Sequence, residues 1–276
     1  VEALVGTDWY QYPTCNGWVL GDFLYDMGTV ITGLSSTGYQ KYNDGNLALC
    51  LPEFSPTTRQ KITTVRGFWN YTFTSIDFSR VTELIKIGSS AFSQSFLTEL
   101  DLSKNTKLVE IDFRAFANSQ LTSLDLSHNT ELVTIGEAAF NLSKLTSLDL
   151  SHNTKLETIG DKSFAQSQLQ SLNLSGNTAL TRIGSLAFYN HRLETIDLSQ
   201  LSALTFIGGY SFGGYNSPAQ TTLMMPNNCN LLMIGSQAFE RVKISSLDLS
   251  NCGKLNHIGD GAFHYAPLTS LTFAPN

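Results

Sequence analysis

The segment Gly209–Gly213 (Gly-Tyr-Ser-Phe-Gly) matches the G-x-S-x-G pattern, which in many hydrolases holds a nucleophilic serine at a sharp strand-to-helix turn. Such a serine acts only with a base nearby. Phe212, however, belongs to a series of phenylalanines that recurs along the chain, and the register of this series places Ser211 in the interior. We therefore predict that Ser211 is buried, and that the protein is not an enzyme.

Two histidines could instead bind a metal. His128 and His152 lie 24 residues apart at equivalent places, so their imidazoles could lie side by side. The same place holds Lys104, Gly176 and Gln200 elsewhere, and no carboxylate or cysteine completes a ligand set. We expect exposed turn residues there, with no metal and no other cofactor.

Acidic residues recur at a further equivalent place. This column comprises Asp77, Asp101, Asp125, Asp149, Asn173, Asp197, Met224, Asp248 and Thr272. On neighbouring strands its members would lie about 4.8 Å apart, where like charges repel by roughly 1 kcal/mol even in water. The column is either drift from one duplicated ancestor or an anionic strip for a basic partner. Asp101, Asp125 and Asp149 are its candidate partner-binding residues.

All these places belong to one repeat. The marker phenylalanines are Phe92, Phe116, Phe140, Phe164, Phe188, Phe212, Phe239 and Phe263. Their spacing is 24 residues, except for 27 between Phe212 and Phe239, and an isoleucine precedes each by five residues. The unit reads L-x-x-L-x-L-S-x-N-x-x-L-x-x-I-G-x-x-A-F. Phe68 marks one degenerate unit before the regular ones.

The positions of one unit predict its local structure. Leu124 and Leu126 alternate with polar residues, which is typical of a short strand with one buried face. Asn129 follows, and its amide can satisfy backbone groups where the chain turns. Ile135, Ala139 and Phe140 follow at i, i+4 and i+5, which is enough for one helical turn packed on the strand. A single unit cannot offset its ordering entropy by burial, so units must stack.

This pattern is that of leucine-rich repeats. Its ending, Ile135–Phe140 (Ile-Gly-Glu-Ala-Ala-Phe), resembles the BspA-like leucine-rich-repeat family of bacterial cell-surface proteins. The resemblance covers roughly residue 29 to the end. It implies an exported protein, extracellular or at the cell surface, that acts in adhesion or partner binding.

We predict an α/β fold: a right-handed leucine-rich-repeat solenoid in the form of a horseshoe, with a parallel β-sheet on the concave face and short helical turns on the convex face. Residues 1–55 would form an aromatic-rich N-terminal cap, and residues 56–276 the array, whose last unit is incomplete. Strands are expected at 29–33 and 47–51, around an Asn-Asp-Gly turn. We expect the chain to continue in a longer parent protein.

The four cysteines are Cys15, Cys50, Cys229 and Cys252. Cys252 falls at the asparagine place of its unit, and Cys229 lies one place later in the preceding unit, which would turn it to the opposite side. A buried free thiol at Cys252 is therefore favoured over a Cys229–Cys252 disulfide. A Cys15–Cys50 pair stays open.

The composition excludes some classes of binding partner. A net charge of −6 and an isoelectric point near 5.3 argue against nucleic acid. No apolar run approaches the length that crosses a bilayer. We expect a monomer that binds proteins or other macromolecules. The alternatives are a structural surface spacer, or glycan binding by the N-terminal aromatic residues Trp9, Tyr10, Tyr12, Trp18, Phe23 and Tyr25.

Specific recognition is assigned to the irregular unit between Phe206 and Met233. Its three extra residues fall in the segment 213–219, and insertions in repeats map to loops on one face. Phe206, Tyr210, Tyr215 and Met224 are the candidate partner-binding residues, because aromatic residues and methionine are enriched at interfaces. Neutral decay of one repeat is the alternative.

Overall fold

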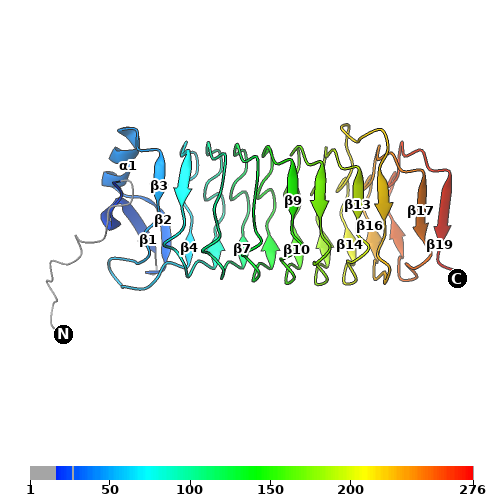
Figure 1. Cartoon of the computed structure of the whole chain (residues 1–276), viewed down its shortest axis with the longest axis horizontal. Coiled ribbons are helices and arrows are strands. Elements are labelled where there is room, and N and C mark those ends of the chain that lie inside the picture. The colour runs from blue at the N-terminus through cyan, green and yellow to red at the C-terminus, as the bar shows by residue number, and fades with distance from the viewer. Residues whose placement is uncertain (1–16, 27, 276) are drawn as a thin grey trace.

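The computed structural model describes residues 17–26 and 28–275, which form an elongated stack of coils (Figure 1). Each regular coil adds one short strand to a long sheet in which every pair except β1–β2 is parallel. The strands of this sheet, in spatial order, are β1 (Phe23–Asp26), β2 (Val30–Leu34), β4 (Thr64–Val65), β6 (Lys86–Ile87), β7 (Glu110–Ile111), β8 (Thr134–Ile135), β10 (Thr158–Ile159), β12 (Arg182–Ile183), β14 (Phe206–Ile207), β16 (Met233–Ile234) and β18 (His257–Ile258). The repeated isoleucine is thus a strand residue, with its side chain in the core.

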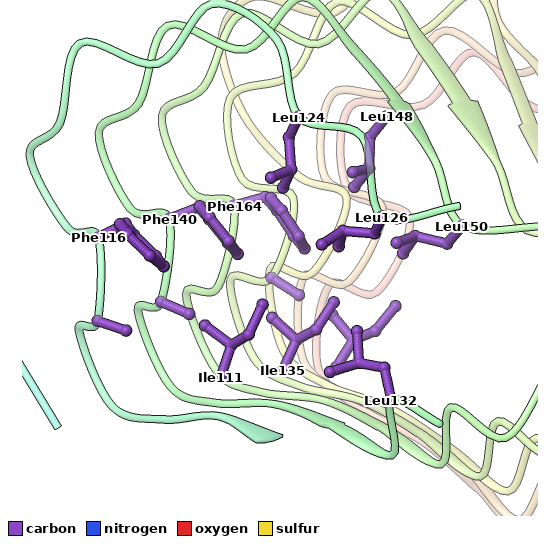
Figure 2. Packing of buried hydrophobic residues seen from close by; sticks show 14 of the residues in the cluster. Ile111, Phe116, Leu124, Leu126, Leu132, Ile135, Phe140, Leu148, Leu150 and Phe164 are labelled. Carbon is purple, nitrogen blue, oxygen red and sulfur yellow. The ribbon is translucent and has the colours of Figure 1, made fainter. Parts of the chain in front are cut away.

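The leucine pairs, which were expected to build the main sheet, form only two-stranded patches. These strands are β3 (Ala48–Cys50) with β5 (Ser75–Asp77), β9 (Ser147–Asp149) with β11 (Ser171–Asn173), β13 (Thr195–Asp197) with β15 (Thr222–Met224), and β17 (Ser246–Leu249) with β19 (Ser270–Phe273). Across the coil from the long sheet, they define the short-strand face (Figure 2). The prediction of strands at the leucine pairs is confirmed for some units only: Leu124 and Leu126 flank an isolated bridge at Asp125, and the pair Leu100 and Leu102 lies on no strand. The prediction that the leucine pairs carry the continuous sheet is wrong.

The third side of each coil, the turn face, carries the phenylalanines. Their rings stack on one another in an unbroken column from Phe68 to Phe263, with centroids 5.2–5.6 Å apart. The predicted register and the degenerate unit at Phe68 are confirmed. Figure 2 shows three of these rings facing the isoleucines and leucines across the core.

The predicted helical turn at the phenylalanine is wrong. Ser90, Phe92 and Gln94 each donate a backbone hydrogen bond to the next coil, at 2.7–2.8 Å, so this stretch forms a ladder between coils. The intervening residues bond within their own turn, as Ala91 does to Gly88. Ser90 and Gln94 have positive φ angles of 52° and 65°, which a right-handed helix does not allow.

The predicted horseshoe is not seen: the coils stack along a straight axis (Figure 1). A leucine-rich array bends when wide helices on one side hold the coils further apart than strands on the other. Here the long sheet and the turn face are both ladders of inter-coil hydrogen bonds, and their spacings are similar. Equal spacing on both sides leaves no reason to bend.

Two features hold neighbouring coils together: asparagine side chains that bond to backbone carbonyls, and glycines that allow the backbones to approach closely. The amide of Asn129 donates from Nδ2 to the carbonyl oxygens of Leu102 and Asn105 in the preceding coil, at 3.1 and 2.9 Å, which confirms the predicted role of the asparagine. Asn105, Asn153 and Asn177 repeat the arrangement. Glycine follows the isoleucine in all the regular units except that of Ile111, where Asp112 stands. It allows close approach, because a Cβ on Gly160 would lie 2.6 Å from backbone atoms of the coil before it.

The N-terminal end departs from the repeat. β1 pairs antiparallel with β2, next to the 3-10 helix η2 (Leu20–Asp22) and the helix α1 (Ser36–Asn43), which Ser35 caps. The strands predicted around the Asn-Asp-Gly turn exist as β2 and β3, but they join different sheets and α1 lies between them. No helix in the described part of the chain is long and apolar enough to cross a membrane.

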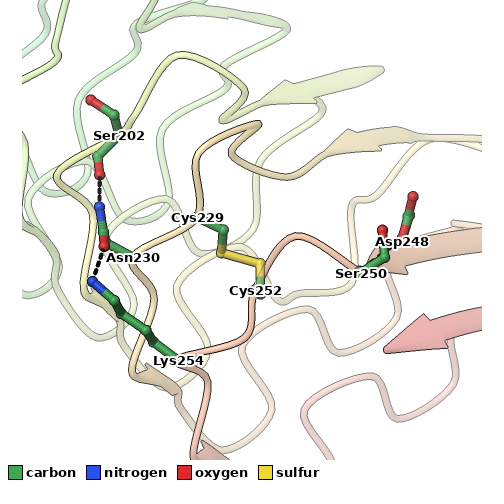
Figure 3. The surroundings of a disulfide bond; sticks show 7 residues. All are labelled: Ser202, Cys229, Asn230, Asp248, Ser250, Cys252 and Lys254. Carbon is green, nitrogen blue, oxygen red and sulfur yellow. Dashed lines mark hydrogen bonds between the residues drawn. A yellow bond between two sulfur atoms is a disulfide. The ribbon is translucent and has the colours of Figure 1, made fainter. Parts of the chain in front are cut away.

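Cys229 and Cys252 form a disulfide between adjacent coils, with Cα atoms 4.8 Å apart (Figure 3). The prediction of a free thiol at Cys252 is wrong. It assumed that a shift of one place turns Cys229 to the opposite side of the turn. In the structure Asn228, at the asparagine place, is exposed, and Cys229 takes the buried position instead. The proposed Cys15–Cys50 pair involves a residue outside the described residues.

Candidate binding surface

The predicted acidic column lies on the short-strand face. Asp125 is bridged to Asp149, which pairs with Asn173 on the next strand, so the alignment is as expected. Each side chain has a local role: Asp125 Oδ1 accepts the backbone N–H of Ser127 at 2.8 Å. The same turn bond recurs at Asp77, Asp101, Asp149, Asn173, Asp197 and Asp248.

These hydrogen bonds also lower the pKa of carboxyl groups in the column. Bonds from the side chain and backbone of Ser127 hold the pKa of Asp125 below its usual range, and Ser103 does the same for Asp101. These hydrogen bonds therefore favour the ionised form of Asp101 and Asp125. A depression on this face is lined by Leu124, Asp125, Ser127, Ser147, Leu148, Asp149, His152, Ser171, Leu172 and Asn173.

The extra residues of the irregular unit form a loop on the turn face. Phe188 stacks on Phe212 and Ile196 pairs with Leu223, so the excess lies between Phe212 and Leu223, as predicted. In Figure 1 the loop rises above its neighbours between β13 and β15. It is anchored by the backbone N–H of Tyr215, which donates to Asn190 Oδ1 at 2.7 Å.

Around this loop the turn face gathers a group of side chains that we name the tyrosine–arginine cluster: Tyr189, Tyr210, Tyr215, Arg241 and Tyr265. The rings of Tyr189 and Tyr210 meet edge to face, with centroids 6.1 Å apart. The guanidinium carbon of Arg241 lies 4.5 Å from the ring centroid of Tyr215 and 4.4 Å from that of Tyr265.

The cluster is continuous and open to solvent. The backbone N–H of Tyr215 bonds to Asn190, the residue after Tyr189, so the two halves of the cluster adjoin. Burial raises the pKa of Tyr189, and the neighbouring Tyr215, Glu240 and Tyr210 raise it further. Tyr215 is 69% exposed and Tyr265 is 57% exposed. The group spans four successive coils, a length on the order of 15 Å at the usual strand spacing.

Phe206 and Met224, the other two predicted residues, lie elsewhere. Phe206 is on β14 in the long sheet, with the guanidinium of Arg182 4.2 Å from its ring centroid. Met224 is on β15 in the short-strand face, where it pairs with Asp197. The structure therefore brings Tyr210 and Tyr215 together and separates them from the other two.

Sequence reasoning missed Tyr189, Arg241 and Tyr265. A signal was present: apart from Leu142, the first two places after each marker phenylalanine from Phe92 to Phe164 carry small or amide residues, such as Ala117 and Asn118. These places become Tyr189, Glu240-Arg241 and His264-Tyr265 around the loop. That shift in composition marks one surface, but only the register reveals it.

The remaining chemical candidates are accounted for. Ser211 is fully buried, as predicted. His128 and His152 are exposed, and each Nδ1 lies 3.2–3.3 Å from the hydroxyl of the preceding serine. Within residues 17–26 and 28–275, no group of three or more His, Cys, Asp or Glu side chains is arranged to hold a metal ion.

The aromatic N-terminal segment is only partly described. Trp9, Tyr10 and Tyr12 lie outside the described residues. Trp18 and Phe23 are buried and contact each other, with ring centroids 5.8 Å apart. These two rings therefore belong to the core and offer no flat platform to a sugar.

The sequence profile of the BspA type leucine-rich-repeat region matches residues 64–191 and 181–276, in six copies. No curated protein matches the chain in sequence. A leucine-rich-repeat protein from Bacteroides ovatus has a similar structure, with a TM-score of 0.56, 18% identity, and coverage of 91% of this chain and 68% of that one. This likeness shows the fold.

Two further solved structures are less similar. A leucine-rich cell surface protein from Faecalibacterium prausnitzii has a TM-score of 0.46 at 16% identity, covering 91% of this chain and 74% of its own. The pneumococcal vaccine antigen PcpA has a TM-score of 0.42 at 17% identity, covering 92% and 79%.

Proposed function

The chain belongs to the BspA-type leucine-rich-repeat family, and from that premise we propose that it is an extracellular binding module that takes a protein partner on the tyrosine–arginine cluster. The single observation that carries the proposal is the exposure of two tyrosines around one arginine beside an inserted loop. Tyrosine and arginine are the side chains that dominate protein interfaces energetically, because they bury much surface at a small entropic cost.

The rest of the molecule suits a rigid support for such a surface. The phenylalanine column and the inter-coil ladders fix each coil against two neighbours, so residues of the turn face vary without disturbing the core. Leu142, which holds the same place as Arg241 in a middle coil, is exposed. The adjacent coils carry Asn118 and Gln166 at this place. The cluster is the departure from this plain pattern.

The disulfide supports an extracellular location. Disulfides persist in oxidising compartments and are rare where glutathione keeps thiols reduced. The Cys229–Cys252 bond joins two coils in the interior, with both residues buried. Secretion followed by oxidation is the route by which such a bond forms.

The test compares the wild-type protein with a Tyr215→Ala/Tyr265→Ala variant against extracellular protein fractions, with a glycan array in parallel. We expect a captured protein whose affinity falls in this variant and is unchanged in a matched control, Leu142→Ala/Gln166→Ala, on the same face of the middle coils. Equal affinity of the cluster variant, with circular dichroism unchanged, would eliminate this surface. Met224→Asp, on the short-strand face, should leave binding unaffected.

A further inference from the structure

The guanidinium of Arg241 is held between two rings, and its Nε makes no hydrogen bond. The rings are those of Tyr215 and Tyr265, and Nε is buried. The nearest carboxylate oxygen, Glu240 Oε1, is 3.6 Å from Nε, beyond a good hydrogen bond. The side chain is still 35% exposed, so its remaining donors face solvent.

Arg182 offers a comparison, because its guanidinium donates a hydrogen bond to a carboxylate. It also lies over an aromatic ring, that of Phe206, but its Nη2 donates to Asp161 Oδ1 at 3.0 Å. Its carboxylate partner comes from the preceding coil. At Arg241 the planar fork is equally fixed by aromatic faces. Its ion-pair partner Glu240 lies on the Nε side at 3.6 Å, and no hydrogen bond from the outer edge of the guanidinium to a carboxylate is found among the described residues.

We propose that the partner supplies such a carboxylate: the tyrosine–arginine cluster binds an acidic peptide segment, with an aspartate or glutamate side chain seated on the outer edge of Arg241. This inference rests on the proposed function and names the chemistry of the partner. A guanidinium donates two parallel hydrogen bonds to a carboxylate, and these charge-assisted bonds are stronger than neutral ones. Because its orientation is already fixed, less entropy is lost on binding.

The surroundings fit a peptide better than a free anion. The exposed surfaces of Tyr215 and Tyr265 lie on both sides of the guanidinium, and the ring of Tyr265 also packs on that of His264, with centroids 3.8 Å apart. Exposed tyrosine surface suits apolar and polar neighbours of the acidic residue. Arg192 and Lys243 flank the loop, since Thr221 bonds to the backbone carbonyls of Leu193 and Lys243. Glu240 is buried beneath the surface.

The experiment selects a phage-displayed library of random peptides on the folded wild-type protein. The best peptides are then synthesised and titrated calorimetrically against the wild type, Arg241→Lys, Arg241→Gln and the matched control Arg182→Gln. We expect enriched peptides to carry Asp or Glu, and affinity to fall about tenfold or more in Arg241→Gln, as loss of a charge-assisted hydrogen bond implies. Arg241→Lys keeps the charge but not the fork, so most of the loss should remain.

Replacing the acidic residue of the peptide by its amide should weaken binding to the wild type but not to Arg241→Gln. The inference fails alone if the peptides bind at Tyr215 and Tyr265 without needing an acidic residue or Arg241. Both the inference and the proposed function fail at this surface if no peptide depends on the two tyrosines. Binding of an acidic glycan in place of any peptide also overturns the assignment.

Discussion

His191 is a buried histidine whose two ring nitrogens are both used by the backbone. Its Nδ1 accepts the N–H of Leu193 at 2.9 Å, so its proton is on Nε2, which donates to the carbonyl oxygen of Phe212 at 2.8 Å. Burial lowers its pKa from 6.5 to about 4. Protonation requires a second N–H where Leu193 already donates, so the folded protein resists the charge.

This residue should make the protein sensitive to mild acid. The unfolded chain binds the proton first, so the free energy of unfolding falls as the pH drops from about 6.5 towards 4. Between pH 7 and 5 the loss from this group is about 2 kcal/mol. Urea unfolding at pH 7 and pH 5 measures this loss of unfolding free energy. His191→Ser, which places the serine of the four preceding coils at this position, should not show this contribution. The same pH dependence in both proteins would assign the loss to other groups.

The acidic column combines repulsion with useful hydrogen bonds. Asn173 accepts the N–H of Ser175 at 3.1 Å just as the aspartates do, so an amide can replace a carboxylate in this turn. We expect Asp125→Asn/Asp149→Asn to keep its unfolding free energy, or gain slightly at low salt, as the repulsion is removed. Alanine at both positions should lose about 1 kcal/mol for each missing acceptor.

The stability of the protein at acid pH tests this prediction separately. The pKa of Asp125 is lowered in the folded state, so its stabilisation is present above the unfolded pKa and is lost as the pH falls below about 4. The amide variant should show a smaller loss there in a pH series of unfolding curves. A clear destabilisation of the amide variant at neutral pH would mean that the second carboxylate oxygens have structural partners of their own.

At the scale of the element, the periodicity predicted the residues of the core but not every element. The leucine strands, the asparagine turn and the phenylalanine column follow directly from which side chains recur. The helical turn did not follow, because the spacing of Ile135 and Phe140 fits both a helix and a turn bonded to the next coil. Only the backbone conformation decides between them. In the ladder of the turn face, Leu142 is exposed and the next residue, Ser143, is buried.

The phenylalanine column tests this element directly. Phe164 is fully buried between Phe140 and Phe188, with ring centroids 5.4 and 5.6 Å away. Phe164→Ala should lower the unfolding free energy by roughly 3–5 kcal/mol, as truncation of a buried aromatic residue does. Thr146→Ala, at an exposed place on the short-strand face, should be nearly silent. An unchanged melting temperature for Phe164→Ala would contradict the packing of the column.

At the scale of the molecule, the sequence placed the irregular unit correctly but could not define its surface. Tyr215 reaches Arg241 and Tyr265 because the loop folds back over the following coils, and the path of a loop is not set by the repeat. Phe206 and Met224 were grouped with it because they are neighbours in sequence. Successive sides of one coil face different directions, so closeness along the chain does not mean closeness on the surface.

The Cys229–Cys252 disulfide gives the stack an uneven stability along its axis. It lies where the asparagine ladder has ended, since Leu201 follows Asn177 at that place and its side chain has no donor. In a solenoid each coil contacts only its neighbours, so a crosslink stabilises the coils near it. The bond closes a loop with a sequence separation of 23, for which chain entropy predicts roughly 3 kcal/mol.

Cys229→Ser/Cys252→Ser should therefore loosen the C-terminal coils and leave the middle ones unchanged. Hydrogen exchange read by mass spectrometry resolves this difference, because amides of β16 and β18 would exchange faster while those of β7 and β8 keep their protection. Because the double variant leaves Cys15 and Cys50 unchanged, faster amide exchange in it reports on the Cys229–Cys252 bond alone. Uniform acceleration along the whole stack would instead show a single cooperative unit, in which a crosslink at one end stabilises every coil.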